Sequence, residues 1–239
     1  MSERPRSITA VLPAYNEAAV IASTARRVDG VLSRSGAVEW EIVVVDDGSH
    51  DGTGDAVRAL AGELPEIRVV AHPVNRGYGA ALRSGFDGAR SEAIWLLDSD
   101  GQFDPADLAL LLPHYGHDAV VAGHRVRRSD PLGRRLSNRA FFALVRLSVG
   151  RLAADINCGF KLFPRAVGEG LTADGAMVST ELLLRAHRAG YRIVDVPVSH
   201  HPRTSGVATG THPRVVLRAF GELARVRRMA TPMAPPEVR

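Results

Sequence analysis

Two acidic residues near the middle of the chain have the spacing of a metal site. Asp98 and Asp100 follow an apolar run, and Gly101 and Gln102 come directly after them. If the run is a strand, residues two apart at its end point the same way, so both carboxylates can reach one divalent cation. Hard oxygen ligands favour Mg²⁺ or Mn²⁺, ions that keep open positions for phosphate oxygens. The other interpretation is a turn whose acids only cap a helix that begins near residue 104.

Three more polar segments follow apolar runs in the same way. They are PAYNE (residues 13–17), DDGSHDGT (46–53) and NRGYG (75–79). In an open parallel sheet, ligands bind at the carboxyl ends of the strands, so all four segments are expected to line one cleft. Asp47 is the candidate to accept hydrogen bonds from a base or ribose, and a helix-capping turn is the alternative for this acidic segment. The glycines do not complete a dinucleotide-binding GxGxxG, because position 82 is leucine.

The elements that must position these residues alternate along the first half of the chain. Short runs rich in β-branched residues predict strands, and stretches with helical periodicity predict helices between them. Strands are expected at residues 8–12, 41–45, 67–71, 93–97 and 119–122, and helices at 17–33, 53–64, 78–89 and 104–112. Asn16, Asp51 and Asp104 are the expected N-terminal caps. This alternation predicts an α/β fold with a mostly parallel, twisted sheet flanked by helices.

The second half of the chain loses this alternation. A loop rich in Pro, Gly and Arg is expected at residues 125–135, an amphipathic helix at 136–150, a strand at 157–164, a helix at 179–189 and a strand at 191–197. The helix at 136–150 either packs on the core or forms part of a lipid-facing wall. The Pro-rich segment at 231–239 is expected to be disordered.

Length and composition indicate one soluble domain. The 239 residues are 45% hydrophobic with a net charge of +4, which excludes disordered and collagen-like chains. Cys158 is the only cysteine, so a cytoplasmic setting without disulfides is expected. No signal peptide is expected, because the start has no apolar stretch of the length of a signal peptide before a polar break, and no membrane span is expected, because no apolar run reaches about 18 residues. Lys161 is the only lysine, and the many arginines suit phosphate, which leaves nucleic acid, anionic lipid and diphosphate ligands open.

Four motifs, in this order and spacing, resemble those of glycosyltransferase family 2. They are LPAYNE (residues 12–17), VVVDDGSHDGT (43–53), NRGYGAALRSGF (75–86) and LLDSDGQFDP (96–105). The chain is most similar to the branch that transfers mannose or glucose to polyprenyl or dolichyl phosphate. The resemblance covers about residues 7–207. It implies one domain of the GT-A fold, a Rossmann-like sheet flanked by helices, at residues 1–207 and inverting transfer from a nucleotide sugar.

The resemblance also implies roles for individual residues. The nucleotide sugar would lie along Pro13, Tyr15, Glu17, Asp47, Gly77, Asp98, Ser99 and Arg203. The divalent metal, Mg²⁺ or Mn²⁺, would be held by Asp98, Asp100 and Gln102. The acceptor phosphate would meet Arg125, Arg135 and Asn138, with Arg134 as the alternative to Arg135. The catalytic set would be Asp98, Asp100, Arg125 and Arg135, while Asp155 opens a matching D-x-x-x-G-F-K segment and Glu181 matches a common glutamate.

Two classes of acceptor remain open at this point. A polyprenyl phosphate is an anionic nucleophile at neutral pH, so it needs cations that hold it in line and no strong base. Arg125 and Arg135 would supply them. A hydroxyl acceptor on a small metabolite or peptide would need a general base instead, and Asp155 and His124 are the candidates.

Two other functions fit parts of the sequence less well, and one further segment suggests a membrane contact. Asp98 and Asp100 also fit a haloacid-dehalogenase-type phosphatase, but Gln102 stands where such sites prefer Thr or Val. A non-catalytic binding module leaves the acidic strand ends unexplained, and acids repel nucleic acid, so no nucleic acid is expected as a partner. A basic amphipathic helix is expected at residues 208–230, either packed on the domain or lying peripherally on the anionic cytoplasmic face of a membrane.

Overall fold

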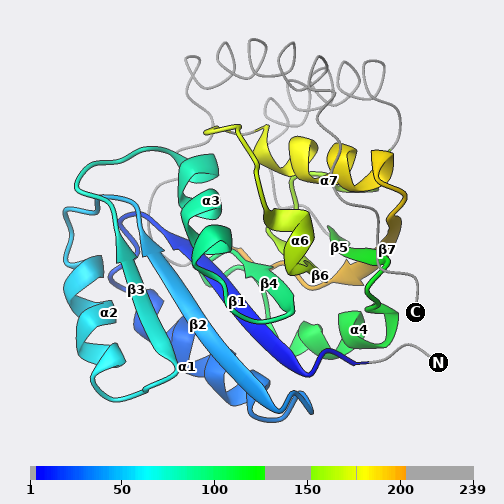
Figure 1. Cartoon of the computed structure of the whole chain (residues 1–239). Helices are drawn as coiled ribbons and strands as arrows, with labels where there is room; N and C mark the ends of the chain where they lie inside the picture. The colour runs from blue at the N-terminus through cyan, green and yellow to red at the C-terminus, as the bar shows by residue number, and fades with distance from the viewer. Residues whose placement is uncertain (1–3, 127–151, 176, 203–239) are drawn as a thin grey trace.

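One sheet organises the part of the chain that the structure describes. The structure is a computed structural model, and the described residues are 4–126, 152–175 and 177–202. The strands are β1 (Ser7–Ala14), β2 (Glu39–Asp46), β3 (Ile67–Ala71), β4 (Ala93–Leu97), β5 (Ala119–Arg125), β6 (Phe160–Pro164) and β7 (Arg192–Val198). Within these residues the seven strands lie in the order β3-β2-β1-β4-β6-β5-β7 (Figure 1).

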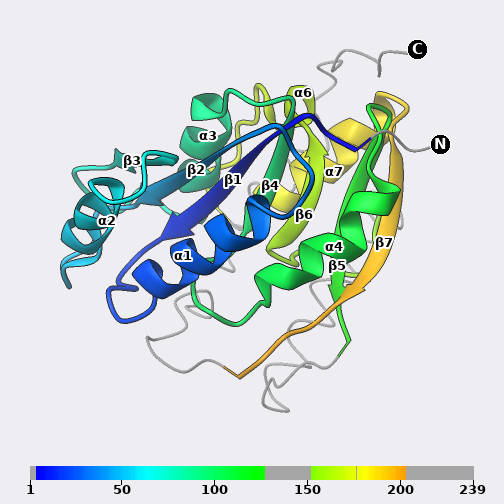
Figure 2. The same cartoon turned by 90° about the horizontal axis from the view of Figure 1, so that it is seen from below.

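Helices cover both faces of this sheet. They are α1 (Ile21–Leu32), α2 (Thr53–Ala61), α3 (Tyr78–Gly88), α4 (Leu108–Leu111), α6 (Arg165–Gly168) and α7 (Val178–Arg188). The apolar stripes of α1, α2 and α4 pack with Ile8, Leu12 and Val44 in one core. Those of α3 and α7 pack with Val11 and Ile94 in a second core on the opposite face. Figure 2 shows α1 and α4 along one side of the sheet and α3 and α7 on the other.

The continuous apolar runs of the central strands reflect this double coverage. β1 runs parallel to β2 and to β4, and β2 runs parallel to β3. A parallel strand with helices on both faces buries successive residues alternately on each side, and neither side faces water. The expected α/β architecture is therefore confirmed, and the five strands expected in the first half are present.

Strand β6 interrupts the parallel pattern. It pairs antiparallel with β4 on one side and with β5 on the other, so that β5 and β7 run in the direction of β4. The strand expected at 157–164 begins only at Phe160, because residues 155–158 form a turn in which the amide of Cys158 donates to the carbonyl of Asp155 (3.1 Å). The direction of β6 puts this turn at the edge where β4 and β5 end.

The expected start of the first helix is wrong. Helix α1 begins at Ile21 and not at residue 17, and Asn16, its expected cap, has a positive φ of 55°. The amides of residues 16–18 donate to side chains of the loop after β2, namely Ser49, Thr53 and Asp51. The helix starts late because Asn16 has a left-handed backbone conformation and residues 18–20 form a turn ahead of the helix.

The other expected caps and boundaries differ less. Asp104 caps the 3-10 turn η1 (Pro105–Asp107) through the amide of Ala106, as expected. The helix expected at 104–112 is present only as η1, α4 and a second 3-10 turn, η2 (Leu112–His114). Gly52, and not Asp51, is the N-cap of α2, although Asp51 still accepts from the amide of Thr53 (3.0 Å). Arg125 closes β5 instead of opening a loop. The expected helices at 136–150 and 208–230 and the tail at 231–239 lie outside the described residues.

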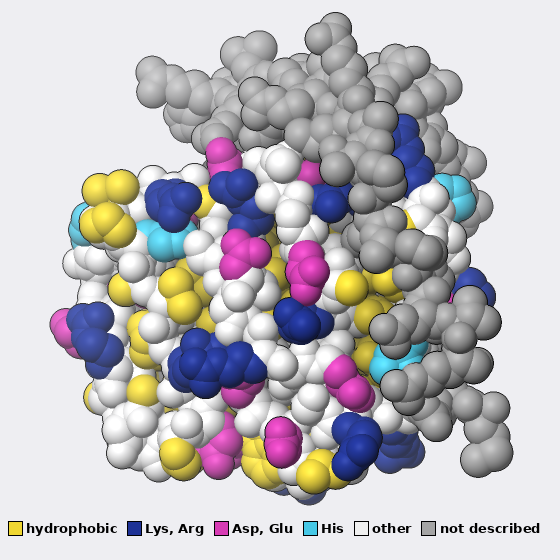
Figure 3. Space-filling view, in the orientation of Figure 1, with side chains coloured by type: hydrophobic (Ala, Val, Ile, Leu, Met, Phe, Trp, Pro, Cys, Tyr) yellow, Lys and Arg dark blue, Asp and Glu magenta, His cyan; other side chains and the backbone are white. Residues whose placement is uncertain are grey.

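The described surface carries mixed charge. On the face shown in Figure 3, basic and acidic side chains are interspersed and the apolar ones are scattered. The large exposed apolar residues belong to separate elements and loops: Val38, Val74, Tyr78, Leu110 and Val126. Among the described helices, none combines the length and the apolar character needed to cross a membrane.

Candidate active site

The carboxyl ends of four strands meet at one edge of the sheet. β1 and β2 are paired through Ala14 and Asp46, Asp98 follows β4 directly, and Arg125 ends β5. Because β6 is antiparallel, its N-terminal end lies at the same edge, where the amide of Asp98 donates to the carbonyl of Gly159 (2.9 Å). The polar segments singled out in the sequence therefore gather at one edge, together with a turn that precedes β6.

The carboxylate of Asp98 is fixed from two sides. The hydroxyl of Tyr78, the first residue of α3, donates to its Oδ1 (2.8 Å). On the other side it lies against the backbone of Gly159, where a Cβ would overlap the carboxylate. Burial, and next the negative charge of Asp100, raise the pKa of Asp98 to about 6. The carboxylates of Asp98 and Asp100 therefore repel each other in a partly buried site.

Gln102 joins this acidic pair to the segment after β7. The backbone amide of Gln102 donates to Asp100 Oδ1 (3.1 Å), and its side-chain Nε2 donates to the backbone carbonyl of His201 (2.9 Å). The amide of His201 donates back to the carbonyl of Gln102 (2.7 Å). Since only the NH₂ group can donate to a carbonyl, the Oε1 of Gln102 is not used in this contact.

These residues fit a divalent cation of the Mg²⁺ or Mn²⁺ type. Asp98 and Asp100 carry hard carboxylate oxygens and Gln102 carries an amide oxygen, and a cation would relieve the repulsion that contributes to the raised pKa of Asp98. No group of three or more His, Cys, Asp or Glu with the geometry of a metal site occurs in the described ranges. A site with so few protein ligands suits ions that complete their shell with phosphate and water.

A buried pair of charges stands beside Asp98. Arg125 Nε donates to Asp155 Oδ2 (2.7 Å) and its Nη2 to Oδ1 (3.0 Å), and Asp155 is only 5% exposed. Burial works against the charge of Arg125, but this bidentate ion pair outweighs it and raises the pKa of Arg125 above its usual value. Arg125 is therefore held at the site edge by one acid that is committed to it.

Lys161 lies completely buried under the same turn. Its Nζ donates to the carbonyls of Ile156 (3.0 Å) and Cys158. Burial lowers the pKa of Lys161, and burial raises that of the Cys158 thiol to about 12, so this cysteine is an inert core residue. Lys161 thus ties the turn before β6 together next to Asp98.

The segment after β1 lies along the same edge. The buried Ser99 donates a hydrogen bond from Oγ to the carbonyl of Pro13 (2.7 Å). Two of the residues proposed to bind the nucleotide sugar are thus in contact. Tyr15 is partly buried and Glu17 is buried in the loop that precedes α1. Asp46, which precedes Asp47, accepts a hydrogen bond from the backbone amide of Ser49 (3.0 Å) and so stabilises the turn after β2.

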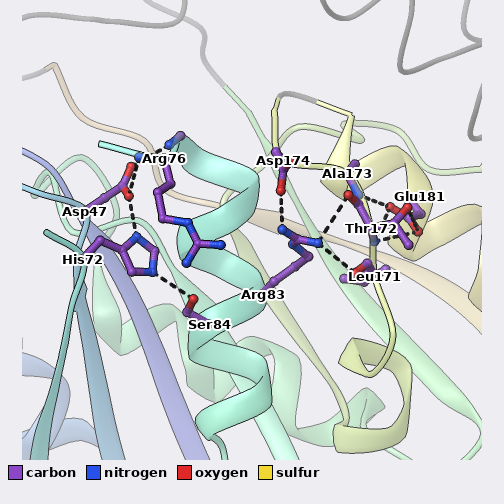
Figure 4. A network of polar contacts seen from close by, with 11 residues as sticks. Asp47, His72, Arg76, Arg83, Ser84, Leu171, Thr172, Ala173, Asp174 and Glu181 are labelled. Atoms are coloured by element: carbon purple, nitrogen blue, oxygen red, sulfur yellow. Dashed lines mark hydrogen bonds and ion pairs between the residues drawn. The ribbon is translucent and has the colours of Figure 1, made fainter. Parts of the chain in front are cut away.

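Asp47 makes more contacts with the protein than the sequence suggests. It is 3% exposed, and its Oδ1 lies 2.6 Å from Nδ1 of His72. Oδ1 also accepts from the amide of Arg76 (2.9 Å), and Oδ2 accepts from that of Gly77 (2.8 Å) (Figure 4). The carboxylate thus holds the loop that leads into α3. A role in contacting the nucleotide stays a prediction, with one acceptor position of Oδ2 left for it.

The N-terminus of α3 is closed by another loop. The amides of Gly79 and Ala80 donate to the carbonyl of Asp174 (2.9 and 3.3 Å), and a Cβ at Gly79 would overlap residues 173 and 174. These amides are therefore not available to a diphosphate. The site differs in this respect from dinucleotide folds, where the first helix binds phosphate through its N-terminus.

Glu181 secures that closing loop. It is fully buried in α7, and its carboxylate accepts from the amides of Thr172 (3.0 Å) and Ala173 (2.7 Å). Arg83 of α3 forms an ion pair with Asp174 in the same loop (Figure 4). The glutamate picked out by the resemblance is thus used for structure, and it holds the start of α3 in place.

The sequence analysis gave no role to three residues that touch or support the acidic residues, namely Tyr78, His72 and Lys161. Tyr78 and Lys161 lie within motifs that were singled out, the NRGYG segment and the D-x-x-x-G-F-K segment, whereas His72 lies outside all of them. Four residues proposed from the resemblance, Arg134, Arg135, Asn138 and Arg203, lie outside the described residues, so their roles stay predictions.

Comparisons with curated proteins point to sugar transfer. Glycosyltransferase AglD of Haloferax volcanii is 34% identical over an alignment of 207 residues, and the alignment covers 82% of this chain and 33% of that protein. Dolichyl-phosphate beta-glucosyltransferase ALG5A of Trichomonas vaginalis is 31% identical over 209 residues, 80% of this chain and 64% of that protein. Undecaprenyl-phosphate 4-deoxy-4-formamido-L-arabinose transferase of Pectobacterium atrosepticum is 28% identical over an alignment of 207 residues, which covers 85% of this chain and 62% of that protein. The chain thus spans less than two thirds of the length of these relatives.

Comparisons with solved structures concern the fold alone. Glucosyl-3-phosphoglycerate synthase from Mycobacterium tuberculosis, in complex with uridine diphosphate, has a TM-score of 0.70 at 23% identity and covers 95% of this chain and 82% of its own. Mannosyl-3-phosphoglycerate synthase from Rubrobacter xylanophilus has a TM-score of 0.66 at 17% identity, with 96% and 78% covered. The expected GT-A architecture is confirmed by these neighbours.

The family model described as Glycosyl transferase family 2 matches residues 9–169, more than half of the chain, and this range includes Asp47, Asp98 and Arg125. The chain belongs to glycosyltransferase family 2.

Proposed function

We propose that the chain is a metal-dependent, inverting glycosyltransferase that moves a hexose from a nucleotide sugar, of the GDP-mannose or UDP-glucose type, to polyprenyl phosphate. Two of the curated relatives carry names that specify dolichyl phosphate or undecaprenyl phosphate. The acceptor of such a reaction is embedded in a membrane, so the proposal requires the chain to meet the cytoplasmic membrane surface.

The observation that carries this proposal is the Arg125–Asp155 pair. A hydroxyl acceptor needs a base, and Asp155 is the better placed of the two candidates. Both of its oxygens are bound by Arg125 at 2.7 and 3.0 Å, and a carboxylate in such a pair is a poor proton acceptor. A phosphate acceptor needs no base, and it needs a positioned cation, which is what Arg125 provides.

His124 does not replace Asp155 as a base. Successive residues of a strand point to opposite faces, so His124 faces away from the side on which Arg125 meets Asp155. Its Nδ1 is buried. The described residues therefore favour an acceptor that arrives as an anion.

The proposed mechanism divides the site into three tasks. Asp98, Asp100 and the Oε1 of Gln102 would hold the divalent ion, which when bound neutralises the charge that develops on the departing nucleoside diphosphate. Asp47 and the segment from Pro13 to Glu17 would hold the nucleoside. Arg125 would hold the acceptor phosphate so that one of its oxygens attacks the sugar carbon from the side opposite the leaving diphosphate, and this inverts the configuration.

The proposal is tested by transfer assays with separate donor and acceptor panels. Purified protein with Mg²⁺ or Mn²⁺ receives labelled UDP-glucose or GDP-mannose and, in parallel, undecaprenyl phosphate, dolichyl phosphate or 3-phosphoglycerate. We expect a labelled product that partitions into organic solvent only with a polyprenyl phosphate. Product formed with 3-phosphoglycerate alone would replace the lipid by a soluble acceptor that attacks through a hydroxyl group, and the argument from the Arg125–Asp155 pair would then be wrong.

A further inference from the structure

A buried histidine links two strand ends to the middle of α3. His72 follows β3 directly and is 8% exposed. Its Nδ1 lies 2.6 Å from Asp47 Oδ1, and its Nε2 lies 2.9 Å from Ser84 Oγ. Figure 4 shows the ring between these two partners, with Asp47 on the β2 side and Ser84 on the helix.

The chemistry of these partners fixes the roles of the two ring nitrogens. An ionised carboxylate can only accept hydrogen bonds. Nδ1 of His72 therefore carries the ring proton and donates a hydrogen bond to Asp47. In the neutral ring, Nε2 then accepts from the hydroxyl of Ser84. His72 therefore acts as a donor toward Asp47, and its contact with Ser84 orients the ring.

Asp47 in turn anchors the loop that leads into α3. A buried carboxylate needs donors, and Asp47 has the ring of His72 and the amides of Arg76 and Gly77. Residues 73–76 of this loop are exposed, so they bury little of their own surface. The loop depends on Asp47 and on the close packing of Gly48 against Val74 and Asn75, where a Cβ would overlap the backbone.

The same loop reaches the metal side of the site. Gly77, bound by Asp47, precedes Tyr78, whose hydroxyl donates to Asp98 Oδ1 (2.8 Å). Gly77 has a φ of 97°, a value that favours glycine, so the chain turns sharply at this point. A continuous set of contacts thus runs from His72 through Asp47 and the loop to Asp98.

A second catalytic activity is the competing explanation for this cluster. Ser84, His72 and Asp47 have the distances of a hydrolase nucleophile, base and acid. Ser84, however, lies within α3, where backbone amides bond inside the helix and none is left to stabilise an oxyanion. The geometry therefore favours a positioning role.

We propose that His72 is a positioning residue for the donor nucleotide, which holds Asp47 so that this carboxylate keeps residues 76–77 in place beside the nucleotide. The inference rests on the proposed function, because it takes Asp47 and this loop to be the nucleotide side of the cleft. Its specific consequence is that nucleotide affinity depends on the donor at Nδ1 and not on the contact at Nε2.

Two substitutions at one position separate these contacts. The side-chain amide of His72→Asn lies near the place of Nδ1 and can still donate to Asp47, whereas that of His72→Gln reaches the place of Nε2 and leaves Asp47 without this donor. Ser84→Ala removes only the outer contact. The affinities for UDP and GDP are measured by calorimetric titration with Mn²⁺, and KM is measured for donor and acceptor.

We expect His72→Gln to weaken nucleotide binding about tenfold, while His72→Asn and Ser84→Ala stay within about threefold of the wild type. The acceptor KM stays unchanged in all three. Equal affinities for the Asn and Gln variants would overturn the inference, as would a loss that falls equally on donor and acceptor. If the wild type binds no nucleotide at all, the proposed function fails and this inference fails with it.

A measurement on the wild type covers the case in which a variant does not fold. In ¹⁵N-histidine NMR spectra, the Nδ1 proton of His72 should exchange slowly, and its resonance should shift when the bound nucleotide is added. A ring proton that exchanges rapidly and ignores the nucleotide would overturn the inference without any substitution.

Discussion

Asp98 is held in a state that costs the fold stability. Burial and the charge of Asp100 raise its pKa to about 6, from a usual 3.8. The folded protein therefore binds a proton at Asp98 more tightly than the unfolded protein does. Ionised Asp98 thus destabilises the metal-free fold above pH 6. This destabilisation disappears as the pH falls toward 4, where Asp98 is protonated in the folded protein. Asp98→Asn should stabilise the metal-free protein at pH 7.5 by about 1–3 kcal/mol and leave it nearly unchanged at pH 4.

Urea unfolding in EDTA at the two pH values measures this difference. Added Mn²⁺ should then stabilise the wild type and leave Asp98→Asn unaffected, and the variant should lose transfer by at least about 100-fold. If Asp98→Asn is less stable than the wild type at pH 7.5, ionised Asp98 does not destabilise the metal-free fold and this explanation is wrong.

Arg125 supplies the second prediction at the scale of single residues. Arg125→Lys keeps a positive charge but cannot make the two parallel hydrogen bonds to Asp155. We expect the acceptor KM to rise at least about tenfold and the donor KM to stay within about twofold. Steady-state kinetics with each substrate varied in turn checks this. A rise that affects the donor alone would move Arg125 to the donor side.

The sequence indicated the acidic residues of the site but not their partners. Asp98 and Asp100 stood out because short-range spacing at a strand end is visible in one stretch of chain. The ties from Tyr78 to Asp98, from His72 to Asp47 and from Arg125 to Asp155 span 20, 25 and 30 residues. Such contacts depend on how the strands are ordered in the sheet, and no local pattern encodes that order.

Helix α3 is the element whose position matters most to the site. Gly79 faces the backbone of residues 173 and 174, and Gly85 faces the side chain of Val11 in β1. A methyl group fits at neither position, so Gly79→Ala and Gly85→Ala should each destabilise the protein by about 1–3 kcal/mol. Only Gly79→Ala displaces the start of the helix and Tyr78, so only this variant should lose affinity for Mn²⁺ by several-fold.

Thermal unfolding and Mn²⁺ titration separate the two effects, and Gly85→Ala is the matched control on the same helix. An equal loss of metal affinity in both variants would mean that general loosening of α3, and not the placement of Tyr78, sets the geometry of Asp98.

The expected elements were mostly present, and the two main misjudgements have physical causes. Helix α1 starts four residues late because Asn16, in a segment bonded to side chains that follow β2, has a left-handed backbone conformation, which outweighs local helix propensity. The direction and place of β6, between β4 and β5, were not predictable, since an apolar run is the same in either direction. That antiparallel strand is what brings Gly159 and Asp155 beside Asp98.

At the scale of the whole molecule, the net charge of +4 does not describe the edge of the sheet at which Asp47, Asp98 and Asp100 follow strands β2 and β4. The described cations that act on Asp98 are the partly buried Arg125 and the buried Lys161, and each of them bonds to the turn before β6. A free nucleoside diphosphate would meet acids first, so we expect it to bind well only together with a divalent cation.

This cooperation predicts a thermal-shift pattern that also identifies the nucleotide. A ligand that binds only the folded state at 100 times its Kd stabilises by about 2.7 kcal/mol, which raises Tm by about 5–10 °C for a chain of this size. With Mn²⁺, either UDP or GDP should produce such a rise, and EDTA should abolish it. Asp100→Ala should abolish it too, because Asp100 belongs to the proposed cation site and is not part of the core. A shift that persists in EDTA would show that the nucleotide binds without the cation, and Asp98 and Asp100 would then need another role.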